Sequence, residues 1–165
     1  LVGCAPATER LGASADRSSV HGALTHFLAG LEPNAAAGLD FPFSLPASVV
    51  RDEDWEALVR SFPSLFATPA ELQRRCQSRG ELTDDDRVQH VRETEASVSA
   101  LSPYDRRLRS QTFYGIRDVL RPLVLADVVR VAPMQDLAPD RPTLLETYPA
   151  AVLDSLDGET YRASL

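Results

Sequence analysis

Two carboxylates, each at the end of a short apolar run, are the side chains best placed to do chemistry. Asp40 follows residues 35–39, and Glu146 follows residues 143–145, with Pro42 and Pro149 close behind them. Short apolar runs bounded by prolines are typical of strands, and the run before Asp40 predicts a buried one. We therefore expect both acids at strand ends, the edge where open α/β sheets usually place their ligands.

Carboxylate oxygens at such an edge suit a hard divalent ion, so Asp40 and Glu146 are the predicted metal ligands for Mg²⁺ or Mn²⁺. Two such ions about 3.5–4 Å apart can activate water in phosphodiester hydrolysis, which makes both acids candidate catalytic residues. A carboxylate among apolar neighbours costs free energy unless something compensates it. The alternative is structural: each acid accepts hydrogen bonds from the turn that follows it.

A row of varied polar side chains is the second candidate site. On a helix predicted over residues 103–122, Arg107, Gln111, Tyr114 and Asp118 share one face, with Arg117 alongside. Guanidinium groups bind phosphate through paired hydrogen bonds, so the row is predicted to hold a phosphate-bearing substrate. The alternative is a solvated face with weak pairing between its arginine and aspartate residues.

The spacing of apolar residues along the rest of the sequence predicts the helices and strands that must position these groups. Helical spacing predicts helices over 17–31, from 52 to Pro63, and from Thr68 to 78. The last begins with a capping signature, in which the Thr68 hydroxyl caps the helix and Glu71 follows three residues later. Strands are predicted over 1–6, before Asp40, over 128–131 and over 143–145, followed by a helix over 150–156. Residues 80–101 are polar, and His90 is expected at the surface. The expected fold class is α/β, with a mixed or partly parallel sheet flanked by helices and a mainly helical insertion around 50–100.

Composition limits the classes of partner. The 165 residues carry a net charge of −7, and all 17 basic residues are arginine. The acidic balance argues against broad nonspecific binding to nucleic acid or anionic membranes. No apolar run is long enough for a transmembrane helix, and two cysteines give neither a zinc spacing nor a disulfide framework. We expect one cytoplasmic domain over 1–165, without membrane attachment.

Three segments taken together resemble the family catalogued as domain of unknown function 429, described as predicted RNase H-like nucleases. They are residues 38–46 (GLDFPFSLP), residues 102–104 (SPY) continuing through 111–120 (QTFYGIRDVL), and residues 144–150 (LLETYPA). The resemblance implies an RNase H-like α/β fold and metal-dependent cleavage of nucleic acid, with Asp40 and Glu146 at motif positions. The family pattern also includes a leading Gly-hydrophobic-Asp strand and a closing helix with an Asp. This sequence shows neither, so we expect a domain truncated at both ends.

Two functions therefore stay open. The first is an RNase H-like metal-dependent nuclease in which Arg107, Gln111, Tyr114, Arg117 and Asp118 contact the substrate. The second is a non-catalytic module that binds a phosphate-bearing ligand or a protein partner on the same fold. The missing terminal acids favour the second function for the chain as it stands.

Overall fold

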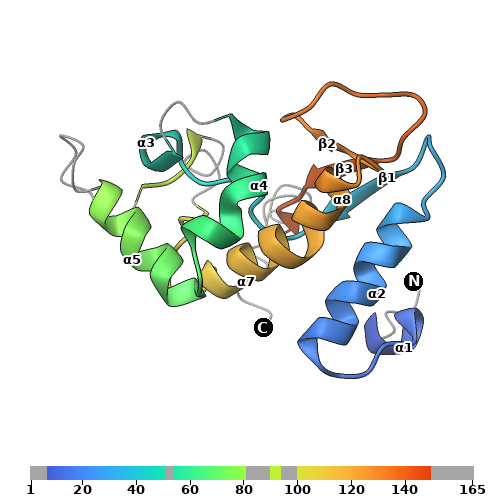
Figure 1. Ribbon diagram of the computed structural model, residues 1–165, viewed down its shortest axis with the longest axis horizontal. Coiled ribbons are helices and arrows are strands. Elements are labelled where there is room, and N and C mark those ends of the chain that lie inside the picture. Colours follow the sequence, from blue (N-terminus) through green and yellow to red (C-terminus); the bar gives the residue numbers. More distant parts are fainter. Residues whose placement is uncertain (1–6, 51–53, 81–89, 94–99, 150–165) are drawn as a thin grey trace, which may run out of the picture.

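The computed structural model describes residues 7–50, 54–80, 90–93 and 100–149, and over these residues the fold is mixed α/β. Figure 1 shows helices gathered around a small sheet. In chain order the elements are α1 (Ala7–Leu11), α2 (Arg17–Ala29), β1 (Ala36–Leu39), α3 (Ala47–Val50), α4 (Trp55–Leu65), α5 (Pro69–Gly80), α7 (Arg109–Tyr114), the π-helical segment η1 (Gly115–Leu120), α8 (Arg121–Leu125), β2 (Arg130–Ala132) and β3 (Thr143–Glu146).

The sheet has the strand order β1-β3-β2, and both strand pairs are parallel. Within the described residues the sheet is thus wholly parallel, which is more uniform than the mixed sheet that the sequence predicts. The register places Leu39 opposite Glu146 and Ala132 opposite Leu145. The carboxyl ends of all three strands therefore lie at one edge of the sheet.

The two faces of the sheet differ in burial. Leu144 of β3 and Val131 of β2 are fully buried in a core shared with the helices, whereas the neighbouring Leu145 is 39% exposed. Side chains alternate between faces along a strand, so one face packs on the helices. The prediction of a buried strand before Asp40 is wrong, because β1 lies at the edge of this sheet and alternates between exposed and partly buried residues.

Local capping explains where the helices begin. The Asp16 and Asp54 side chains accept hydrogen bonds from the backbone N–H groups of Ser19 and Ala57, at the starts of α2 and α4. At α5, the Thr68 hydroxyl accepts from the Glu71 N–H, as its sequence signature predicts. Each cap satisfies a backbone donor that the first helical turn leaves unpaired.

Three sequence predictions about the helices and loops are wrong in detail. Pro63 lies inside α4, which continues to Leu65, because proline removes one backbone donor near the end without stopping the last turn. The helix predicted over 103–122 begins only at Arg109, after a series of turns. His90 is buried, with its backbone N–H donating to the Tyr104 hydroxyl at 2.7 Å.

The consecutive elements α7, η1 and α8 form one continuous helix, the central helix, whose hydrogen-bonding pattern changes in the middle. The Gly115 N–H donates to the Gln111 carbonyl four residues earlier, whereas the Arg121 N–H donates to the Ile116 carbonyl five residues earlier. This wider turn belongs to a π-helix, a feature found frequently at functional sites. The spacing of 100° per residue that underlies the predicted polar row does not hold through η1.

The predicted strand over 1–6, the predicted helix over 150–156 and Cys4 lie outside the described residues. In the part of the chain that is described, no helix is long and apolar enough to cross a membrane.

Candidate functional site

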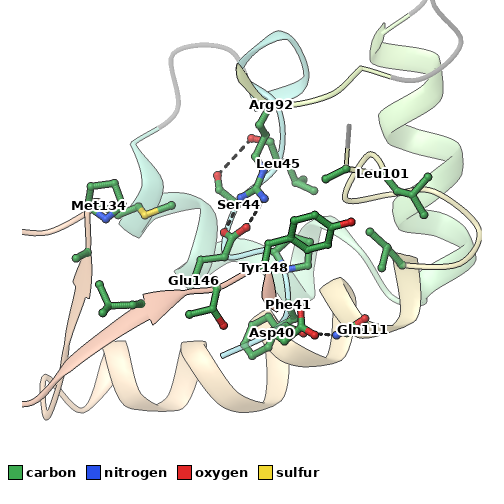
Figure 2. A pocket seen from close by; sticks show the side chains of 17 residues that line it. Asp40, Phe41, Ser44, Leu45, Arg92, Leu101, Gln111, Met134, Glu146 and Tyr148 are labelled. Atoms are coloured by element: carbon green, nitrogen blue, oxygen red, sulfur yellow. Dashed lines mark hydrogen bonds and ion pairs between the residues drawn. The ribbon is translucent and has the colours of Figure 1, made fainter. Parts of the chain in front are cut away.

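A pocket of about 880 Å³ opens where the three strands end. Asp40 directly follows β1, Pro133 follows β2, and Thr147 follows β3, and all three line the pocket. This is the position at which open α/β sheets bind ligands. Most of the lining side chains are apolar, and Figure 2 shows Met134 and Leu101 at opposite sides of the pocket.

The segment after β1 forms one wall and is held at several points. The Gln111 side-chain amide donates to the backbone carbonyl of Asp40. The ring of Phe41 lies against Gly115, where a Cβ atom would come within 2.4 Å of the ring. The indole N–H of Trp55 donates to the Phe43 carbonyl at 2.9 Å. Together these contacts hold the backbone from Asp40 to Phe43 in place.

The Asp40 side chain itself is exposed. The premise that its carboxylate is buried and needs compensation is therefore wrong. Among the described residues, no hydrogen bond or ion pair reaches the Asp40 carboxylate. The acid lies at the rim of the pocket, where water can solvate it.

Glu146 is in the opposite situation, because its carboxylate is fully engaged. Both terminal nitrogens of Arg92 donate to it, Nη1 to Oε2 at 2.6 Å and Nη2 to Oε1. The backbone N–H of Phe43 also donates to Oε2, at 2.8 Å. The Arg92 and Glu146 side chains are only 14% and 26% exposed. A paired, two-point contact of this kind is among the stronger charged hydrogen bonds.

The two predicted metal ligands are brought to neighbouring strand ends, yet the oxygens present do not fit a divalent ion. Arg92 occupies both oxygens of Glu146, and a guanidinium in that position repels a cation. Among the described lining residues, Asp40 is then the one carboxylate whose oxygens are open to a metal ion. The described residues contain no group of three or more His, Cys, Asp or Glu side chains that could hold a metal ion.

The residues of the predicted polar row do not form one site, because they contact different parts of the structure. Gln111 belongs to the pocket. Arg107 lies before α7 begins, is largely exposed, and pairs with Asp105 through its Nε at 3.3 Å. Arg107 therefore does not share a helical face with Gln111.

Two other members of the row, Tyr114 and Asp118, contact helix α2, and Arg117 lies beside them. Arg17 lies over the Tyr114 ring, with its guanidinium carbon 3.9 Å from the ring centre, and His21 Nδ1 is 3.3 Å from Asp118 Oδ2. Arg117 contacts Asp118 through its Nε at 2.5 Å. Partial burial opposes ionisation of Asp118, but the hydrogen bonds and charges of Arg117 and His21 outweigh it, and the pKa of Asp118 is lowered. Tyr114 and Asp118 thus bind α2 to the central helix, and Arg117 pairs with Asp118 from within the central helix itself.

Sequence reasoning missed Arg92, which contributes the guanidinium of the pocket. Arg92 stands in the polar segment 80–101, where no apolar periodicity marks a side chain that points inward. Tyr148 and Met134 were missed as well, although both closely follow predicted strands. Proximity to a strand end was the available signal for these two residues.

Comparison of the chain with protein-family models, curated proteins and solved structures finds no match in any of the three.

Proposed function

We propose that this chain is a binding module that takes a small, mainly apolar molecule into the pocket at the carboxyl ends of β1, β2 and β3. The observation that carries the proposal is the convergence of all three strand ends on one cavity. A volume of about 880 Å³ lies within the range of small-molecule sites.

The lining supports binding more than hydrolysis. Small-molecule sites combine apolar walls with a few fixed polar groups that orient the ligand. Here the walls include Leu101, Met134 and Leu145, and the polar groups include Gln111 and the Arg92–Glu146 pair. Pairing with Glu146 satisfies the charge of Arg92 inside the protein. The pocket therefore favours apolar contact over capture of a phosphate.

A pocket-filling substitution tests this function. Nile red, a neutral apolar dye, should bind the wild-type chain, and its affinity is measured from the rise in the dye's own fluorescence when it enters an apolar site. Leu145→Trp should lower the dye's affinity by occupying the cavity. The control is Leu137→Trp, because Leu137 is also exposed but does not line the pocket. Absence of dye binding to the wild type, or equal loss in both variants, would contradict the proposal.

The metal-dependent nuclease is the second candidate function, favoured by the adjacency of two acids. Leu39 pairs with Glu146, so Asp40 comes one residue beyond that pair, directly after the neighbouring strand β1. In this candidate Asp40 and Glu146 are catalytic, and nucleic acid is the substrate. This candidate requires that Arg92 leave the Glu146 carboxylate before Glu146 can bind Mg²⁺ or Mn²⁺.

Thermal unfolding with Mn²⁺ separates the two candidates. A ligand that binds only the folded state raises the melting temperature. The nuclease candidate requires a rise with Mn²⁺ that Asp40→Asn abolishes. The binding module requires no such rise in either protein, and its Nile red affinity should not depend on Mn²⁺.

A further inference from the structure

The charges that line the pocket do not balance. Asp40 and Glu146 are acidic, and Arg92 is the basic residue among the described lining residues. Because Arg92 and Glu146 neutralise each other through a two-point contact, the negative charge of Asp40 remains. The chain as a whole is also acidic, with a net charge of −7, which favours the approach of cations.

Asp40 is placed to use that charge on a ligand. Its backbone is fixed by the Gln111 amide, and the Thr147 N–H donates to the neighbouring Leu39 carbonyl at 3.0 Å. Its carboxylate, in contrast, receives no hydrogen bond or ion pair from the residues that the structure describes. Asp40 therefore loses no contact with these described residues when its carboxylate binds an external cation.

Aromatic rings add a second reason to expect a cation. Phe41 and Tyr148 both line the pocket, and Figure 2 shows them in the same part of it as Asp40. The faces of aromatic rings attract organic cations. Farther from Asp40, the lining is dominated by aliphatic side chains and Met134, which suit an uncharged apolar body.

We propose that the pocket selects organic monocations, molecules with one ammonium group on an apolar body, and that Asp40 recognises the ammonium group. This inference rests on the proposed function, since it requires the pocket to bind small molecules. It adds the class of ligand and names the residue that determines specificity.

Three probes of similar size and different charge test the proposal: phenethylamine, phenethyl alcohol and phenylacetate. Their affinities for the wild-type chain are measured by ligand-observed NMR at neutral pH. An ion pair at the protein surface contributes at most about 1 kcal/mol, so phenethylamine should bind roughly threefold to fivefold more tightly than the alcohol. Phenylacetate should bind more weakly than the alcohol, and added salt should reduce both differences.

Variants assign the preference to Asp40. Asp40→Asn should bring the amine and the alcohol to equal affinity, while Asp40→Glu, which keeps the charge, should retain a preference for the amine. Asp140→Asn is the matched control, because it removes an exposed aspartate that does not line the pocket. It should leave the preference unchanged.

The outcomes distinguish this inference from the function on which it rests. If the amine and the alcohol bind equally to the wild type, and Leu145→Trp weakens both, the pocket binds ligands but the charge selection is wrong. Tighter binding of phenylacetate would also overturn the selection. If none of the three probes binds and Nile red does not bind either, both proposals fail.

Discussion

The Phe41 ring occupies the space in which any residue at position 115 other than glycine would place its Cβ atom. A Cβ built there lies 2.4 Å from Phe41 Cδ2 and 2.5 Å from Cε2. Gly115 is buried in the central helix, with an ordinary helical backbone conformation. The glycine is therefore required by the close approach of the pocket wall and not by a special dihedral angle.

Gly115→Ala should accordingly destabilise the fold, because the Phe41 ring must move and disturb the wall beside Asp40. Overpacking of this kind costs about 1–3 kcal/mol of unfolding free energy. The measurement is urea denaturation. The control is Gly22→Ala in α2, where nothing lies within 4 Å of the added Cβ, and which should stabilise by about 0.5–1 kcal/mol. Equal effects of the two substitutions would refute the close contact.

Glu146→Gln should destabilise the chain because it replaces the partly buried two-point ionic contact with Arg92 by a weaker neutral one. We expect a loss of about 1–3 kcal/mol in unfolding free energy, below the value for fully buried pairs because both side chains retain some exposure. Arg60→Gln, which removes the exposed pair with Glu56, should cost at most about 0.5 kcal/mol. A double-mutant cycle of Arg92→Ala and Glu146→Gln should show coupling; additive effects would mean that the pair contributes nothing.

Acid should weaken the contact between α2 and the central helix. The folded-state pKa of Asp118 is lowered, so its contribution is present above the unfolded value of 3.8 and is lost as the pH falls through the folded pKa. Asp118→Asn should lower stability at neutral pH and flatten the acid side of the stability curve. Urea midpoints measured from neutral pH down to about pH 2 test this. Parallel curves for variant and wild type would be inconsistent with the assigned pKa.

Cys76 should be unreactive in the folded chain. The thiol is fully buried, and burial raises its pKa to about 12 despite the nearby charge of Arg79. Because the thiolate is the reactive form, iodoacetamide at mildly alkaline pH should modify Cys76 slowly in buffer and rapidly in urea. Peptide mass mapping distinguishes Cys76 from Cys4. Modification at the same rate in both conditions would show that the site opens readily.

The strand ends were predictable from sequence because their signals are local. Apolar runs followed by prolines located Asp40 and Glu146 correctly, and the register of β1 with β3 brings the two acids to the same edge. The capping residues of α5 were equally readable. The sequence pattern did not predict that Asp40 is exposed, because this exposure depends on the position of β1 at the edge of the described sheet.

Long-range contacts account for most of what sequence reasoning missed. The Arg92–Glu146 pair joins residues 54 positions apart, and no local spacing predicts it. The prediction of the polar row was wrong for a different reason. It assumed one uninterrupted α-helix from residue 103, whereas the helix starts at Arg109 and contains the wider turn of η1. Tyr114 and Asp118 therefore contact α2, while Gln111 contacts the pocket wall.

The π turn in η1 also affects how the chain tolerates changes in length. A turn closed by a five-residue hydrogen bond holds one more residue than an α-helical turn. Deleting one residue from 115–120 while keeping Gly115 would convert the turn to an ordinary one and leave α7 and α8 near their present orientations. The same deletion within α4 would rotate all later residues of that helix by about 100° and move its buried side chains out of the core. Within the helix that runs from α7 to α8, η1 is thus the segment that can lose a residue with least disturbance.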